Sequence, residues 1–117
     1  MDNINPEIKV GDCSCPKNHT LFELDITTDN YPEDFSWQLM NSNNTVLANR
    51  SNYEEQYKYY YYRECVAVTN NECAMLRLFD SYGDGGTFYI VSWNGNVIEE
   101  GKQSNNNNPE ITMGNCR

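Results

Sequence analysis

The chain has 117 residues, of which 38% are apolar and 13% aromatic, and nine of them are tyrosines. Its 17 acidic and 8 basic residues give a formal net charge of −9. Nucleic acid phosphates and anionic membrane surfaces repel such a chain, and no run of 18 apolar residues predicts a membrane-spanning helix. The length predicts one domain, and the scarcity of helix formers favours an all-β fold.

The first twelve residues are predicted to form a strand-like arm. Ile4, Pro6, Ile8 and Val10 alternate with polar residues, which is the pattern of a half-buried strand. Pro6 lacks a backbone N–H and therefore belongs on an edge strand. We expect this arm to dock on a sheet, either that of its own chain or that of a neighbouring subunit, where these four residues would form the subunit interface.

Residues 13–117 are predicted to form a jelly-roll-like β-sandwich of about eight short antiparallel strands. Turn signals separate the strand-like runs, and the Asn94-Gly95 pair predicts a two-residue hairpin. The expected strands span residues 20–27, 35–41, 45–49, 55–68, 74–79, 87–93, 96–100 and 110–113.

The segment DSYGDGG at residues 80–86 is an acidic, glycine-rich turn between two strand-like runs. It is not an EF-hand loop, because it lacks the acidic residues expected at positions 3 and 12. A second acidic turn at residues 29–34 could complete a Ca²⁺ site. The ligands we expect are Asp80 and Asp84, then Asp29, Asn30 and Glu33, with a carbonyl near Tyr82. The alternative is that hydrogen bonds of the Asx type hold both loops without a metal.

The segment DNYPEDFSWQL at residues 29–39, the cysteines Cys65 and Cys73, and DSYGDG at residues 80–85 together resemble an extracellular module. This module occurs in secreted multidomain proteins of marine bacteria and microalgae. The resemblance covers about residues 20–101 and implies a calcium-stabilised β-sandwich used for adhesion, carbohydrate contact or assembly, without a known activity. Phe35 and Gly86 depart from the usual pattern, but neither replaces an expected metal ligand.

Five cysteines in a short chain predict an oxidising, extracellular or cell-surface location. Helped by the resemblance, we expect Cys65 to pair with Cys73 across a short turn, and either Cys13 or Cys15 to pair with Cys116. The remaining thiol would be free or would bridge two subunits, and the spacings are poor for zinc. The N-terminus lacks the pattern of a signal peptide, and we interpret the chain as a mature secreted form. Three sequons allow N-glycosylation, at Asn18, Asn43 and Asn49.

The run YKYYYYR at residues 57–63 places tyrosines on both faces of an expected strand. Tyr57, Tyr59 and Tyr61 share one face and are candidates for contact with a sugar or a partner subunit. The alternative is that one row is core and the other is an ordinary surface ladder. Trp37 and Trp93 lie inside apolar strand patterns and are expected in the core.

No catalytic motif is present in the sequence, and His19 is the single histidine, so we expect no enzyme. Two functions remain. The first is a structural subunit that assembles into a fibre or surface layer through its N-terminal strand, braced by calcium and disulfides. The second is a calcium-dependent carbohydrate-binding or adhesive module. The sequence analysis favours the first, mainly because of the arm.

Overall fold

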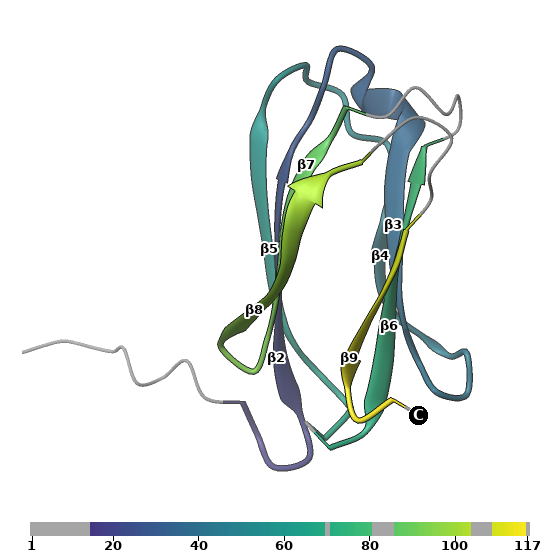
Figure 1. The fold of residues 1–117 in the computed structure, drawn as a ribbon, viewed down its shortest axis with the longest axis vertical. Coiled ribbons are helices and arrows are strands. Elements are labelled where there is room, and N and C mark those ends of the chain that lie inside the picture. Colours follow the sequence, from purple (N-terminus) through teal and green to yellow (C-terminus); the bar gives the residue numbers. More distant parts are fainter. Residues whose placement is uncertain (1–14, 70, 81–85, 104–108, 117) are drawn as a thin grey trace, which may run out of the picture.

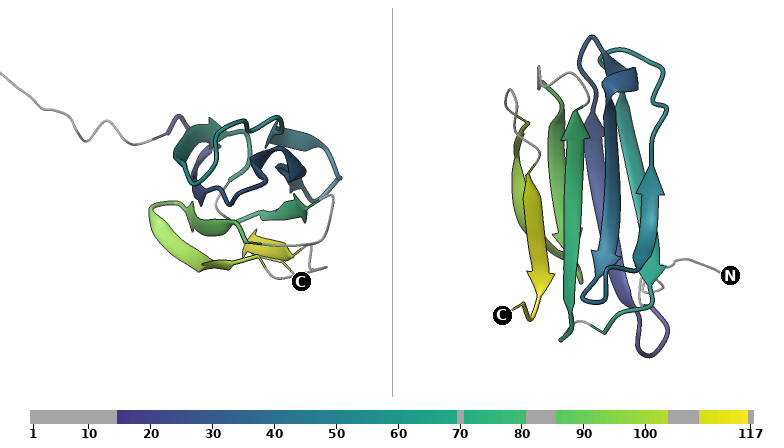
Figure 2. Two further views of the ribbon diagram at one scale, coloured as in Figure 1. Left: turned by 90° about the horizontal axis from the view of Figure 1, so that it is seen from above. Right: turned by 90° about the vertical axis from the view of Figure 1, so that its right-hand side faces the viewer.

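Two four-stranded antiparallel sheets pack face to face in the computed structural model, which describes residues 15–69, 71–80, 86–103 and 109–116 (Figure 1). One sheet has the strand order β5-β2-β7-β8 and the other has the order β4-β3-β6-β9. Figure 2 views the same two layers along the strands and from the side. The elements are β2 (Thr20–Thr27), the 3₁₀ turn η2 (Pro32–Asp34), β3 (Phe35–Asn41), β4 (Val46–Arg50), β5 (Tyr59–Val66), β6 (Cys73–Asp80), β7 (Phe88–Trp93), β8 (Asn96–Lys102) and β9 (Glu110–Gly114).

The expected all-β sandwich is confirmed. Strands β3 and β4 form one hairpin, and β7 and β8 form another. Each other connection between successive described strands crosses from one sheet to the other, and this wrapping makes the sandwich jelly-roll-like. The predicted Asn94-Gly95 turn joins β7 to β8, and both residues have positive φ angles, as the two-residue hairpin requires.

The core lies between the sheets and follows from a period of two along the strands. Strand β2 alternates strictly, with Phe22, Leu24 and Ile26 facing inward, while Glu23 and Asp25 between them face outward. Strands β3 and β6 supply the opposing layer. Its largest buried side chains are Phe35, Trp37, Leu39, Leu76 and Leu78.

The two tryptophans lie in the core, as predicted, and Trp37 is anchored by a residue outside any strand. Trp37 Nε1 donates a hydrogen bond of 2.9 Å to the hydroxyl of Tyr53, which is buried in the connection between β4 and β5. The ring of Tyr53 also packs against Phe35 and Tyr60. This connection is therefore part of the core rather than a loose loop.

The predicted disulfide pairing is wrong, because Cys65 and Cys73 lie in different sheets. Cys65 is near the end of β5 and bonds to Cys15, with a Cα–Cα distance of 5.5 Å. Cys73 begins β6 and bonds to Cys116, which follows β9, at 4.6 Å. The connection from β5 to β6 crosses the sandwich, so each cysteine finds its partner beside its own sheet. Cys116 consequently does not pair with Cys13 or Cys15.

Both disulfides lie at one end of the sandwich. The residues opposite each other at that end are Leu21 and Cys65 in one sheet, and Cys73 and Gly114 in the other. The 3₁₀ turn η2 lies at the opposite end (Figure 1).

The N-terminal arm lies outside the described residues, and so does Cys13. The arm contains the expected interface residues Ile4, Pro6, Ile8 and Val10. No helix among the described residues is long and apolar enough to span a membrane.

Candidate functional site

The residues that flank the second acidic segment, Asp80 and Gly86, lie beside the first acidic segment at the end of the sandwich that carries η2. Asp80, the last residue of β6, lies directly opposite Phe35, which follows η2. Gly86, which precedes β7, lies against the side chain of Asp29, which follows β2. Asp80 and Gly86, the described residues on either side of residues 81–85, therefore lie next to Phe35 and Asp29, although about 50 residues separate the two segments in sequence.

One carboxylate oxygen of Asp29 accepts a backbone hydrogen bond, and the other lies against Gly86. Its Oδ1 accepts a hydrogen bond of 2.8 Å from the backbone N–H of Tyr31, so residues 29–31 form an Asx turn. Its Oδ2 lies 2.6 Å from the position that a Cβ atom would take on Gly86. The Gly86 N–H donates to the carbonyl of Gln103 at 2.8 Å. Gly86 is thus anchored to the residue that follows β8.

The predicted calcium ligands are only partly described by the structure. Asp80 is buried and Asp29 half-buried, while Asn30 and Glu33 are exposed. Asp84 and Tyr82 lie outside the described residues. Within the ranges that the structure describes, no three Asp, Glu, His or Cys side chains lie close enough together to hold a metal ion.

Asp34 is a buried acidic residue that the sequence analysis did not single out. Its side chain is 7% exposed, and it immediately precedes Phe35, the neighbour of the buried Asp80. Two buried carboxylates on adjacent chain segments are unfavourable unless hydrogen-bond donors or a cation compensate them. Asp34 was found only from the structure, because the sheet register brings the end of η2 to the end of β6.

Four of the exposed apolar side chains on the outer face of the β5-β2-β7-β8 sheet come from β5 and β7, and we call this face the aromatic face. Tyr59 and Tyr61 come from β5, and Phe88 and Ile90 from β7; they are 57%, 49%, 55% and 36% exposed. Tyr59 and Phe88 both lie opposite Thr27 of the central strand β2. Tyr61 and Ile90 both lie opposite the next outward residue, Asp25. The four side chains therefore form two rows that run across the strands.

Carboxylates lie near the two tyrosines of this face and affect the pKa of each. The Tyr61 hydroxyl donates a hydrogen bond to Glu23. Partial desolvation, together with this bond and the charge of Glu23, raises the pKa of Tyr61 to about 12. Desolvation and then the neighbouring carboxylate of Asp25 also raise the pKa of Tyr59. Both phenols keep their protons at neutral pH, and both residues are largely exposed to solvent.

The tyrosines of residues 57–63 form two rows on β5, and one row packs inward, as one of the two alternatives predicted. Tyr60 and Tyr62 pack against the core, and Tyr59 and Tyr61 point outward. Tyr57 departs from the prediction because β5 begins only at Tyr59. It lies in a turn with a φ of 51° and is 70% exposed. Tyr57 is therefore not a member of the strand ladder.

A shallow pocket of about 340 Å³ lies between Tyr57 and the aromatic face. Its walls combine two aromatic rings with hydroxyl, amide, carboxylate and amine groups, supplied by Thr27, Thr28, Asp29, Asn30, Tyr57, Gly86, Phe88 and Lys102. Such a mixture of aromatic surface and converging polar groups is typical of small-molecule and sugar sites. The sequence analysis identified neither Phe88 nor Lys102 as a site residue. For Phe88 the reason is the nearly continuous apolar run after residue 87, which does not reveal which side chains face outward.

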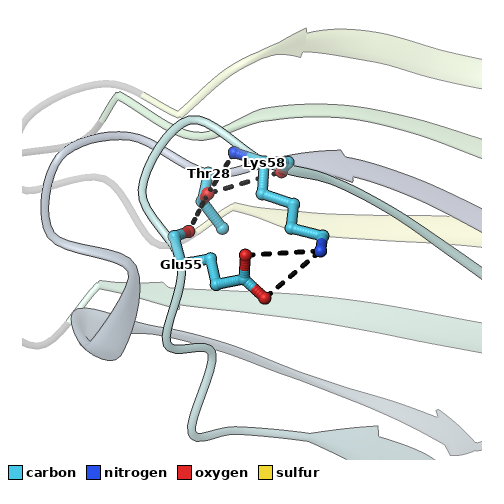
Figure 3. Close-up of polar contacts among 3 residues, drawn as sticks. All are labelled: Thr28, Glu55 and Lys58. Atoms are coloured by element: carbon cyan, nitrogen blue, oxygen red, sulfur yellow. Dashed lines mark hydrogen bonds and ion pairs between the residues drawn. The ribbon is translucent and has the colours of Figure 1, made fainter.

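Hydrogen bonds hold the turn that carries Tyr57 against the end of β2 (Figure 3). Thr28 Oγ1 donates to the carbonyl of Glu55 at 2.7 Å and accepts from the N–H of Lys58 at 2.9 Å. The Tyr57 N–H donates to the carbonyl of Asp29 at 3.2 Å. An ion pair of 3.2 Å between Lys58 and Glu55 closes the turn. The pocket wall is therefore formed before any ligand arrives.

Strand β8 is an edge strand with exposed aliphatic side chains. Val97 and Ile98 are 60% and 41% exposed, and within the described part of the chain β8 pairs with β7 alone. An unpaired apolar edge is a surface to which a further strand can add.

The predicted glycosylation sites Asn18, Asn43 and Asn49 are all exposed.

No protein-family model, curated protein or solved structure matches this chain. The resemblance to the extracellular module therefore stays a prediction. The arguments below rest on the geometry of the described residues.

Proposed function

We propose that this chain is a non-enzymatic, secreted carbohydrate-binding module that uses the aromatic face as its binding surface. The observation that carries this proposal is a pair of exposed rings on one sheet face, those of Tyr59 and Phe88, which lie on either side of Thr27. Monomeric proteins rarely leave several large apolar side chains together in solvent without a binding role. Aromatic rings stack on the apolar faces of sugars, and adjacent carboxylates and hydroxyls accept and donate the polar bonds.

Calcium has a bracing role in this proposal. The ligands are Asp80 and Asp84, with Asp29, Asn30 and Glu33 and a carbonyl near Tyr82. The adjacency of Gly86 to Asp29, and of Asp80 to the end of η2, supports this assignment because it brings both loops to one place. A divalent cation would neutralise carboxylates that otherwise repel each other. The two disulfides would hold the opposite end, as suits an extracellular protein.

Binding to a glycan array tests the proposed function. The native protein should bind one glycan class, and Tyr59→Ala and Phe88→Ala should each weaken that binding without unfolding the domain. Val46→Ala is the matched control, because Val46 is an exposed apolar residue on β4, in the other sheet. An array without any bound glycan, or binding that both ring deletions leave intact, would contradict the proposal.

The second candidate is a structural subunit that assembles into a fibre or surface layer. The exposed apolar edge of β8 favours it, since a strand donated by a neighbouring chain would gain main-chain hydrogen bonds and cover Val97 and Ile98. The N-terminal arm is the proposed donor, and such a head-to-tail contact propagates into a filament. Electron microscopy of the native protein with and without residues 1–11 tests this candidate. Filaments that persist after the deletion would exclude the arm as donor.

A further inference from the structure

We infer that the aromatic face binds a neutral, extended β-1,4-linked glycan that runs across the strands and stacks alternate sugar rings on Tyr59 and Phe88. This inference rests on the proposed function and adds the linkage, the charge and the direction of the ligand. It comes from the positions of the rings in the sheet register rather than from their exposure alone.

The separation of the two rings is set by the sheet. Tyr59 on β5 and Phe88 on β7 lie on either side of Thr27 on β2. Two interstrand spacings place their backbones about 10 Å apart. This is close to the repeat of an extended β-1,4-linked chain, in which every second pyranose ring presents the same face. One sugar would therefore stack on each ring, and the sugar between them would lie over Thr27.

The polar groups along this row suit sugar hydroxyls. The Thr27 side chain lies midway, and the row continues to Lys102, which pairs opposite Phe88 and holds its Nζ 5.6 Å from the centre of that ring. The pocket opens beside the row and adds the carboxylate of Asp29 and the side chain of Asn30. A chain lying across Tyr59, Thr27 and Phe88 would thus have hydrogen-bonding partners along its flank.

The charge of the protein selects a neutral ligand. With a formal net charge of −9, the chain repels polymers rich in uronate or sulfate groups. The second row supports the same conclusion, because Asp25 and Glu100 lie on either side of Ile90 in the register. In that second row, β7 supplies the aliphatic side chain of Ile90, whereas in the first row it supplies the aromatic ring of Phe88. We therefore place the glycan on the row of Tyr59 and Phe88.

The length of the ligand tests this placement. The probes are disaccharides, trisaccharides and hexasaccharides of β-1,4-linked glucose, mannose and N-acetylglucosamine, with a β-1,3-linked glucose hexasaccharide as linkage control, measured by titration calorimetry. A trisaccharide is the shortest chain that spans both rings. For at least one β-1,4-linked series, we expect affinity to rise about tenfold or more from disaccharide to trisaccharide. The β-1,3-linked hexasaccharide should bind more weakly than its β-1,4-linked counterpart.

The variants separate this inference from the proposed function. Tyr59→Ala and Phe88→Ala should each lower the affinity for the hexasaccharide about tenfold and remove the gain at the trisaccharide. Ile90→Ala, on the same face, should retain the length dependence. Three outcomes would overturn the inference and leave the proposed function standing. The affinity could fail to rise at the trisaccharide, Ile90→Ala could lose as much affinity as the two ring deletions, or the array could show binding only to glycans of another linkage. A protein that binds no glycan at all would overturn both.

Discussion

The carboxylate of Asp29 occupies the space in which any side chain on Gly86 would begin. The position of a Cβ atom on Gly86 lies 2.6 Å from Asp29 Oδ2, and the residue has a φ of 107°. This contact joins the end of β2 to the start of β7 at the edge of the pocket. It therefore links the two acidic loops of the sequence and one end of the aromatic face.

Gly86→Ala should destabilise the domain by about 1–3 kcal/mol, because the methyl group adds both backbone strain and a steric clash with Asp29. Gly95→Ala is the matched control, since Gly95 also has a positive φ of 83° but has no atom within 4 Å of its Cβ position. Urea unfolding of both variants isolates the clash. Equal losses of stability would show that the Asp29 contact contributes nothing.

Tyr53→Phe should lower stability by about 1–3 kcal/mol, because it leaves the buried Trp37 N–H without its acceptor. Tyr57→Phe removes the same atom from a highly exposed residue and should have almost no effect on unfolding. Chemical denaturation followed by tryptophan fluorescence measures both variants. A Tyr53→Phe protein as stable as the native one would contradict the anchoring role of this hydrogen bond.

The domain should lose stability as the pH rises from about 10 to about 12. Desolvation, followed by hydrogen bonds to Glu23, Glu64 and Glu99, raises the pKa of Tyr61, Tyr62 and Tyr89 to about 12 in each case. An unfolded tyrosine has a pKa near 10. Below pH 10 both states keep these protons; between the two values only the unfolded state releases them, so unfolding becomes more favourable.

Ultraviolet titration of the phenolate band tests this pH dependence. Native protein should show a late group of tyrosines near pH 12, which merges with the rest in denaturant. Tyr89→Phe should reduce the late group by one residue. If native and denatured proteins gave the same titration curve, the carboxylate hydrogen bonds would not exist in solution.

Removal of calcium with EDTA should lower the melting temperature, and added Ca²⁺ should stabilise by about 2.7 kcal/mol at a hundredfold excess over its dissociation constant. Asp80→Asn and Asp29→Asn should each reduce this response, because they remove proposed ligands. Glu54→Gln is the control, since it makes the same charge change at an exposed position. A melting temperature that is independent of Ca²⁺ would contradict the metal site and would leave hydrogen bonds as the support of these segments.

Peptide mapping without reduction should recover Cys15 linked to Cys65 and Cys73 linked to Cys116. Each bridge closes a loop of more than 40 residues, so its removal should cost about 2–4 kcal/mol. The double variant Cys73→Ser/Cys116→Ser measures this for one bridge by thermal unfolding. Recovery of a peptide that joins Cys65 to Cys73 would contradict the fold at the β5–β6 crossing.

The sequence by itself determined the strands and one of the turns. Alternation along residues 20–27 and 35–41 predicted β2 and β3 with their observed bounds, because one buried face imposes a period of two. The Asn94-Gly95 pair predicted its hairpin, because few other residues accept two successive positive φ angles. The boundary of β5 was less accurate, since tyrosine suits both a strand and the turn that holds Tyr57.

Only the tertiary structure decided which strands are neighbours. Alternation indicates which face of a strand is buried, but it contains no information about the partner strand, which is chosen by packing between segments far apart in the sequence. For this reason the sequence paired Cys65 with its near neighbour Cys73, whereas the sheets place it beside Cys15. For the same reason Tyr59 was a candidate in the sequence, but its alignment with Thr27 and Phe88 exists only after β5, β2 and β7 have assembled.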